Sequence, residues 1–293
     1  MNPSKYGDGR RPSTYEGRAL PRPGQDVTDQ GLTFDVATVV SRRQALRVLG
    51  IGAAALGLAA CSDSTTSTST GSTSTNSTST GEIPEETAGP FPGDGSNGPD
   101  VLEQSGVVRK DIRSSFGGAT GRAEGVPLTL EMEIKDLANG GTAFNGAAVY
   151  VWHCDREGRY SLYSEGATEE NYLRGVQIAD ADGKVSFTSI FPACYPGRWP
   201  HVHFEVYPDE ASITDHTLVI ATSQLALPQD ACDAVYALPG YETSAQNVAG
   251  LSLEGDNEFG DDGAVHQLAT ATGGASAGYK AFLTVGIDTT NEP

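Results

Sequence analysis

Alternation of apolar and polar residues with a period of two is the feature that most constrains the fold of this chain. It begins after Pro127, where Leu128, Leu130, Met132 and Ile134 alternate with polar residues. Successive side chains of a β-strand point to opposite faces, so this pattern predicts a strand with one buried face. Turn-forming residues separate it from similar runs further along the chain. These runs cover residues 147–153, 185–190, 202–207, 219–224 and 279–287.

No long helical pattern lies between these runs. Several short strands without intervening helices favour an antiparallel β-sandwich over an α/β fold. The segments outside the runs are less regular. Residues 82–125 are rich in Gly, Pro and acidic residues, with a weak extended pattern at 107–112, and residues 227–278 contain one possible short helix at 233–238. We therefore expect an all-β sandwich with long irregular loops over residues 82–293.

The first 60 residues have the character of an export signal. Arg42 and Arg43 form a twin-arginine pattern, and an uncharged apolar run from Val48 to Ala60 follows them. A run of this length with basic residues before it and small residues after it is typical of a signal peptide and too short for a mature membrane span. An ordinary buried helix rich in Ala and Leu is the alternative. We expect residues 1–60 to be a twin-arginine signal peptide.

The apolar run ends in Leu58-Ala59-Ala60-Cys61, which resembles the lipobox of bacterial lipoproteins, where the cysteine is acylated and becomes the new N-terminus. Residues 62–81 are nearly all Ser, Thr and Gly, and such a composition cannot bury enough apolar surface to fold. Residues 61–81 are therefore expected to be a disordered tether. The sequence predicts a cell-envelope lipoprotein that touches the membrane only through lipid on Cys61, with its domain on the extracytoplasmic side.

The part of the chain after residue 60 is strongly acidic. The whole chain has a formal net charge of −19, and the part without residues 1–60 has 11 basic and 33 acidic residues, a net charge near −22. Nucleic acid and anionic membrane surfaces would repel such a protein, so neither is an expected partner. Because cations are few, an arginine beside a candidate site carries more information than usual.

Three cysteines follow Cys61, namely Cys154, Cys194 and Cys232. In an exported protein two of them could form a disulfide, and the sequence leaves all three pairings open. None has the spacing of a structural zinc site. His153, next to Cys154, has two interpretations, as a polar residue at a strand end or as a supporting donor near a site.

His201 and His203 are the first candidates for chemistry. Residues two apart in a strand share a face, so the pair can present two imidazoles to one point, although such pairs also occur without a ligand. Tyr195 lies on the turn before this strand, and Tyr160 ends the turn after the strand at 147–153. Either tyrosine alone would be taken for a packing residue. Together, two phenolates and two imidazoles suit a hard trivalent cation, and binding would require the phenols to ionise below their usual pKa.

The order of these residues resembles the catalytic core of the intradiol ring-cleavage dioxygenases, which include the catechol 1,2- and protocatechuate 3,4-dioxygenases. The resemblance covers about residues 85–290, is specific mainly in 147–206, and is strongest to an exported branch of the family. The shared motifs are Gly158-Arg159-Tyr160, Leu173-Arg174-Gly175-Val176-Gln177, Asp180-Ala181-Asp182-Gly183, Tyr195 and His201-Val202-His203-Phe204, with Thr87-Ala88-Gly89-Pro90-Phe91 as a weaker one.

The resemblance implies one ferric ion, Fe(3+), held by Tyr160, Tyr195, His201 and His203. In the family the Tyr195-type and His203-type ligands are axial and the other two equatorial. The axial phenolate leaves the metal when a catechol binds and accepts a substrate proton. The resemblance also assigns Arg198 to stabilising negative charge on the bound ring and Gln224 to lining the substrate pocket.

The implied activity is the opening of a catechol-type ring by O₂ between its two hydroxylated carbons, giving a cis,cis-muconate-type diacid. The segment between Tyr195 and His201 is shorter than in the cytoplasmic enzymes, and the dimerising helical region of catechol 1,2-dioxygenases is missing. The catechol derivative and the oligomeric state therefore stay open. The alternatives are a non-catalytic surface lipoprotein that binds a metal or an aromatic ligand, and an enzyme that uses copper or zinc on the same residues.

Overall fold

The computed structural model describes residues 14–15, 18–19 and 81–290. The chain divides into two compact units, residues 1–75 and 76–293. In the first unit, β1 (Thr14–Tyr15) and β2 (Arg18–Ala19) pair antiparallel. Apart from these four residues, the predicted signal peptide at 1–60 lies outside the described residues, as do the lipidation site at Cys61 and all of the tether except Gly81. Within the described ranges, no helix is long and apolar enough to cross a membrane.

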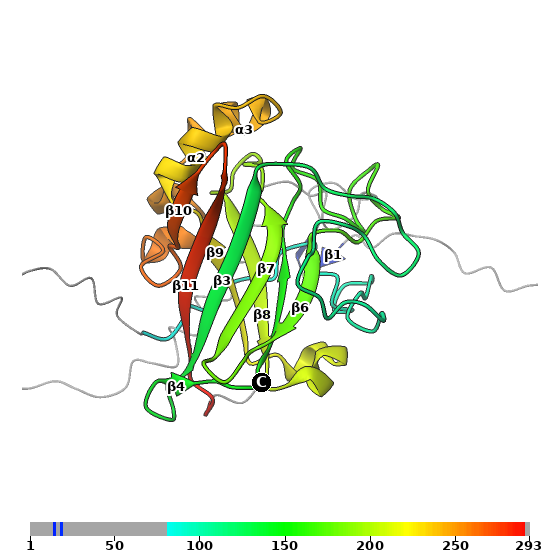
Figure 1. Cartoon of the computed structure of the whole chain (residues 1–293), viewed down its shortest axis with the longest axis vertical. Coiled ribbons are helices and arrows are strands. Elements are labelled where there is room, and N and C mark those ends of the chain that lie inside the picture. The colour runs from blue at the N-terminus through cyan, green and yellow to red at the C-terminus, as the bar shows by residue number, and fades with distance from the viewer. Residues whose placement is uncertain (1–13, 16–17, 20–80, 291–293) are drawn as a thin grey trace, which may run out of the picture. The chain divides into compact units, whose positions relative to one another are not determined.

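Strands form most of the regular structure of the second unit (Figure 1). They are β3 (Pro127–Asp136), β4 (Thr142–Ala143), β5 (Ala148–Trp152), β6 (Arg174–Ile178), β7 (Lys184–Ile190), β8 (His201–Tyr207), β9 (Ala221–Ala226), β10 (Thr270–Gly274) and β11 (Gly278–Ile287). One sheet has the order β10-β11-β3-β4, with β7 also paired to β3, and the other has the order β6-β5-β8-β9. The expectation of a chain made mainly of strands is confirmed. The strands at 174–178 and 270–274 were not predicted.

The strand β3 is the centre of the first sheet and has the predicted alternation. Leu128, Leu130, Met132 and Ile134 are buried, whereas the residues between them are half-buried. Its neighbour β7 runs antiparallel to it, but β11 runs parallel, with Tyr279 beside Leu128. The expectation of a wholly antiparallel arrangement is wrong for this pair. The hairpin from β10 returns the chain to the end of the sheet where β3 begins, so β11 has the same direction as β3.

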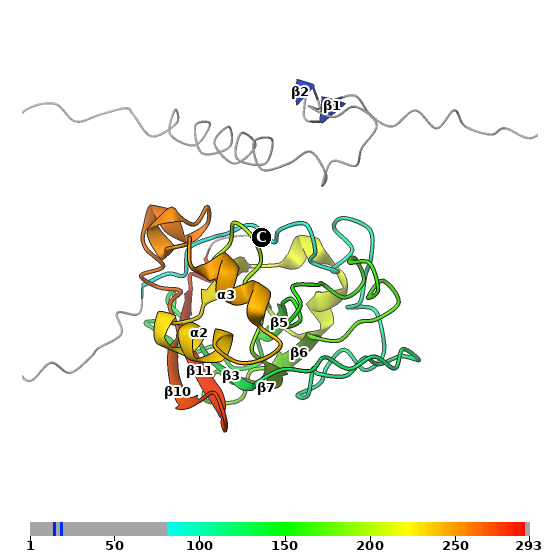
Figure 2. The ribbon, with the colours of Figure 1, turned by 90° about the horizontal axis from the view of Figure 1, so that it is seen from above.

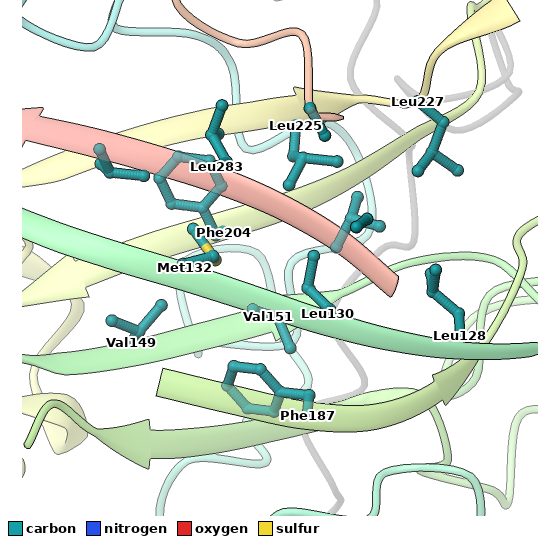
Figure 3. Close-up of a cluster of buried hydrophobic side chains, with 14 of the residues drawn as sticks. Leu128, Leu130, Met132, Val149, Val151, Phe187, Phe204, Leu225, Leu227 and Leu283 are labelled. Carbon is teal, nitrogen blue, oxygen red and sulfur yellow. The ribbon is translucent and has the colours of Figure 1, made fainter. Parts of the chain in front are cut away.

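One buried apolar core joins the two sheets (Figure 3). In Figure 3, side chains from β3, β7 and β11 of the first sheet form one cluster with side chains from β5, β8 and β9 of the second sheet. Burial of a large apolar side chain contributes about 1.5–3 kcal/mol, so this shared core fixes the faces that β5 and β8 turn inward. The labelled members are Leu128, Leu130, Met132, Val149, Val151, Phe187, Phe204, Leu225, Leu227 and Leu283.

Among the described residues, the helices lie between β8 and β10. Figure 2 shows α2 (Gln229–Tyr236) and α3 (Glu242–Val248) lying next to each other near β10 and β11. The predicted helix at 233–238 exists as α2 but begins four residues earlier. Ala231, Cys232 and Val235 of α2 belong to the shared core, so this helix covers one end of it. Four single 3-10 turns complete the segment: Glu210–Thr214, His216–Leu218, Leu253–Gly255 and Phe259–Asp261.

Candidate metal centre

The strand β8 supplies both the core and the candidate site, because its successive residues face opposite ways. Val202, Phe204 and Val206 belong to the shared core. His201 and His203 lie on the opposite face and are 2% and 3% exposed. The core therefore fixes the direction of both imidazoles. Sequence reasoning predicted this face from the two-residue spacing alone.

The four predicted donors lie next to one another. The hydroxyl oxygens of Tyr160 and Tyr195 are 3.5 Å apart, and the Tyr195 hydroxyl is 3.1 Å from Nε2 of His201. The Nε2 atoms of His201 and His203 are also 3.1 Å apart. Two oxygens and two nitrogens from three separate parts of the chain therefore form one continuous cluster, which we call the Tyr-His cluster.

The lone pairs of the Tyr-His cluster have defined directions. Nδ1 of His201 donates its proton to the carbonyl of Trp199, which leaves the lone pair of Nε2 facing Tyr195 and His203. Nδ1 of His203 is buried and has no hydrogen-bond partner in the described part of the chain. The imidazole of His203 is held by stacking instead, with the Trp152 ring centroid 5.0 Å away and the planes 6° apart.

Burial keeps the Tyr-His cluster uncharged. It raises the pKa of Tyr195 to about 12 and that of Tyr160 well above its usual value. Burial also lowers the pKa of His201 to about 3 and that of His203 well below its usual value. The oxygen and nitrogen atoms of these four neutral groups converge, and they share few protons for hydrogen bonds among themselves. Such a donor set fits a cation that can displace the phenolic protons. No group of three or more His, Cys, Asp or Glu in the described ranges has metal-binding geometry, since half of the donors here are tyrosines.

The segment 82–94, called here the covering arm, lies against the Tyr-His cluster. Gly89 has a φ of +69°, and a Cβ at this position would meet Cε1 of His203 at 3.3 Å, so a larger residue is disfavoured both by strain and by contact. The ring of Phe91 is 4.9 Å from that of Tyr160. Arg174 donates to the carbonyls of Phe91 and Pro92. The weak Thr87–Phe91 motif thus marks backbone that packs on the site.

Arg198 and Gln224, the other predicted site residues, contact each other. Nη2 of Arg198 donates to Oε1 of Gln224 over 2.6 Å, and Nε2 of Gln224 donates to the carbonyl of Thr87 in the covering arm over 3.0 Å. Gln224 is the register partner of His203 across β8 and β9. The structure therefore brings all six predicted residues into one region.

Asp256 is a site residue that sequence reasoning missed. Its carboxylate accepts from Nε of Arg198 at 3.1 and 3.3 Å and from the backbone N–H of Trp199 at 2.6 Å, and its side chain is 1% exposed. Burial alone would raise the pKa of Asp256, but the Arg198 guanidinium and the backbone N–H groups of Trp199 and Glu258 together lower it below its usual value. Asp256 lies in the irregular segment 227–278, where no periodic pattern distinguishes it from other acidic residues. Only its non-local contacts reveal it.

Two open surface hollows lie away from the Tyr-His cluster. One lies on the outer side of the first sheet, and the other lies beside residues 82–85 and 286–288. The first has lysine and glutamate side chains in surface ion pairs, such as Lys280 with Glu131. Neither contains a buried cluster of donors, so the chemistry of the side chains places the candidate site at the Tyr-His cluster.

Comparison with known proteins supplies the decisive observation. Residues 97–203 match a family model described as Dioxygenase. Catechol 1,2-dioxygenase of a Pseudomonas species is 32% identical over 93 residues, which cover 32% of this chain and 28% of the relative. Chlorocatechol 1,2-dioxygenase of Rhodococcus opacus is 38% identical over 55 residues, which cover 19% of this chain and 21% of the relative. Over this part of its length, the chain is similar to the intradiol ring-cleavage dioxygenases.

The chain also has the fold of a solved intradiol dioxygenase. The intradiol ring-cleavage dioxygenase from Tetranychus urticae superposes with a TM-score of 0.55 at 20% identity, covering 73% of this chain and 97% of that one. The matches to the curated relatives extend over less than half of their lengths. The residues of the family match include Tyr160, Tyr195, His201 and His203, whereas Gln224 and Asp256 lie beyond it.

His153 and the three cysteines after Cys61 are not part of the Tyr-His cluster. Both ring nitrogens of His153 are satisfied, Nδ1 by the carbonyl of Cys154 at 2.8 Å and Nε2 by the hydroxyl of Ser189 at 2.7 Å. This agrees with its interpretation as a polar residue at a strand end. The disulfide left open by the sequence is not formed, since Cys154, Cys194 and Cys232 are all free and buried.

Proposed function

We propose that this chain is an intradiol dioxygenase that uses Fe(III) and O₂ to open a catechol-type ring between its two hydroxylated carbons, giving a cis,cis-muconate-type diacid. The observation that carries the proposal is the convergence of the Tyr-His cluster, with successive donor atoms 3.1–3.5 Å apart. Tyr160, Tyr195, His201 and His203 would hold the metal, as the family resemblance implies. The names of the relatives point to the same reaction class.

The two phenols are held differently, which supports different roles. Tyr160 is 2% exposed and its ring packs against Phe91 in the covering arm. Tyr195 is half-buried on the turn between β7 and β8, two residues before Gly197, which has a φ of +88°. Tyr195 is therefore the phenol that can leave the cluster when a catechol enters and accept one of its protons. A bound ferric ion would make the catecholate ring reactive toward O₂.

Other residues would orient the substrate and exclude water. Arg198 supplies a cation beside the cluster, where it can offset negative charge on a bound ring. The covering arm and the stacked Trp152 close the inner side around His203, so entry is left to the side of Tyr195. The short turn between Tyr195 and His201 supports an open pocket at that side.

We also propose the cellular setting that the first 81 residues predict. The twin-arginine signal peptide at 1–60 would export the folded domain, and lipid on Cys61 would anchor it through the tether at 61–81. The domain at 82–293, with its two sheets packed as a β-sandwich, would then face the extracytoplasmic side. Export in a folded state would allow iron to be loaded first.

Iron loading and a catechol panel test the proposed function. The purified domain is loaded with ferric iron, its visible spectrum is recorded, and catechols are added under air. We expect a phenolate-to-iron charge-transfer band that shifts on addition of a catechol, followed by oxygen uptake and a ring-opened diacid. Tyr160→Phe and His203→Ala should each disrupt the band. Tyr163→Phe, a partly exposed tyrosine whose ring also packs on Phe91, is the matched control and should keep it.

Two results would contradict this proposal in different ways. A charge-transfer band without oxygen uptake on any catechol would favour the non-catalytic lipoprotein that binds a metal or an aromatic ligand. Retention of copper or zinc in preference to iron would favour an enzyme of a different metal.

A further inference from the structure

Asp256 and Arg198 form a buried ion pair, and Gln224 holds the same guanidinium at a second nitrogen. Nε of Arg198 donates to the Asp256 carboxylate at 3.1 Å, and Nη2 donates to Gln224 at 2.6 Å. A planar guanidinium held at two different nitrogens cannot rotate about its terminal bonds. Nη1 has no hydrogen-bond partner among residues 81–290, so its direction is set by the other two contacts.

Asp256 is itself held in place by backbone groups. Its carboxylate accepts from the N–H groups of Trp199, Glu258 and Phe259 in addition to Arg198. The ring of Phe259 lies under the guanidinium, 5.8 Å from Cζ to the ring centroid. The short segment 256–259 thus provides both a carboxylate and an aromatic face for one arginine.

The same segment is connected to the covering arm. Oε2 of Glu258 accepts from the backbone N–H of Thr87 at 3.1 Å, and the carbonyl of Thr87 accepts from Gln224 at 3.0 Å. Because Gln224 accepts from Arg198, the contacts form a closed ring that runs through β9, the covering arm and the segment 256–259. An arginine in such a ring has one orientation available.

We propose that Asp256 is the positioning residue of Arg198, which holds the guanidinium so that Nη1 points at the ring of a substrate bound to the Tyr-His cluster. The inference rests on the proposed function for the identity of the substrate. Asp256 does not contact the reacting atoms and acts through Arg198. Its carboxylate also offsets the charge of a buried cation that would otherwise be costly to hold without a substrate.

Kinetics of Asp256 variants in the iron-loaded protein test the effect on the reaction. A hydrogen bond to a charged group is usually strong enough that Asp256→Asn should lower kcat for catechol about 10- to 100-fold. KM and the charge-transfer band should change little, because the proposed metal donors are untouched. Asp256→Glu should restore part of the rate. Glu254→Gln, which removes an exposed carboxylate two residues away, should leave the rate unchanged.

A double-mutant cycle separates positioning from general support of the fold. If Asp256 acts through Arg198, adding Asp256→Asn to Arg198→Lys should cost less than about 2-fold more in kcat. The same 10- to 100-fold loss in both backgrounds would overturn the proposal.

Hydrogen exchange in the metal-free protein gives a readout that does not depend on activity. The Nε–H of Arg198, assigned by its loss in Arg198→Lys, should exchange slowly in the unchanged protein and about 10-fold or more faster in Asp256→Asn. Equal exchange rates would overturn the proposal. Asp256→Glu serves the same measurement if Asp256→Asn does not fold. Absence of catechol turnover in the unchanged iron-loaded protein would instead refute the proposed function, while exchange would still decide whether Asp256 fixes Arg198.

Discussion

The indole of Trp152 lies flat against the imidazole of His203, with centroids 5.0 Å apart and the planes 6° from parallel. The pairing follows from the sheet, since Trp152 on β5 and His203 on β8 are register partners. Because Nδ1 of His203 has no hydrogen-bond partner in the described part of the chain, this ring contact is what orients the imidazole.

Replacement of Trp152 should therefore affect both stability and metal binding. Trp152→Leu should lower the free energy of unfolding by about 2–4 kcal/mol and weaken iron binding, because the cavity leaves His203 free to turn. Trp152→Phe keeps an aromatic face and removes a buried Nε1–H without a partner, so its cost should be smaller. Urea unfolding and iron titration measure the two effects. Equal iron affinity in both variants would contradict the orienting role of Trp152.

His153 and His203 are two buried histidines that can be compared directly. His153 follows the end of β5, and His203 lies on the neighbouring strand β8. His153→Gln should cost about 1–3 kcal/mol of stability, because two buried hydrogen bonds are lost or weakened, and should leave the iron content unchanged. His203→Gln should lower the iron content. Elemental analysis of the purified variants measures this. Loss of iron in His153→Gln would mean that His153 supports the metal after all.

Arg174 is expected to act through geometry rather than charge. It is 1% exposed, and its guanidinium donates to the hydroxyls of Ser161 and Tyr150 and to the carbonyls of Phe91, Pro92 and Ser161. A lysine keeps the charge but cannot make these contacts, so Arg174→Lys should cost about 2–4 kcal/mol and loosen the covering arm.

Arg113→Lys is the control for Arg174→Lys. Arg113 pairs with Asp111 in a partly exposed ion pair, and its substitution should cost less than about 1 kcal/mol. Chemical denaturation of both variants gives the comparison. Similar costs at the two positions would show that the buried contacts of Arg174 contribute little.

The pair of Glu86 and Glu258 predicts a dependence of stability on pH. Burial and the neighbouring Glu258 raise the pKa of Glu86 to about 9 from a usual value of 4.5. Between these two pH values the folded protein keeps a proton that the unfolded chain releases. Stability should therefore fall as the pH rises from about 4.5 to 9, by on the order of 1 kcal/mol or more.

Glu86→Gln removes the titrating group and should flatten this decline. The variant should be more stable than the unchanged protein at pH 9 and show little difference at pH 5. Urea unfolding at several pH values measures it, with the exposed Glu103→Gln as the control. A decline that persists in Glu86→Gln would assign the proton to another group.

The sequence predicted the parts of the site that depend on local geometry. The spacing in β8 predicted one face for His201 and His203, and the residues 156–159 predicted that Tyr160 follows a turn after β5. The meeting of these residues was expected from the family resemblance, since no local rule joins Tyr160 to a strand some 40 residues away. The strongest strand patterns, such as that of β3, were also found.

What sequence reasoning missed depends on contacts between distant segments. Asp256 and Glu258 lie in a segment without periodicity, so their attachment to Arg198 and to the covering arm left no local signal. β10 consists of Thr, Ala and Gly that are largely exposed, so it lacks the alternation that identifies a strand. The parallel pairing of β11 with β3 is a property of chain direction, which side-chain patterning does not encode.

The division of β8 between its two faces limits how this protein can change. A single-residue insertion or deletion within β8, between His203 and Phe204, would exchange the faces of the residues on one side of it, placing either the imidazoles in the apolar core or Phe204 on the face of the donors. Evolution can therefore lengthen or shorten this strand only in steps of two, and variation in site shape must come from the flanking loops.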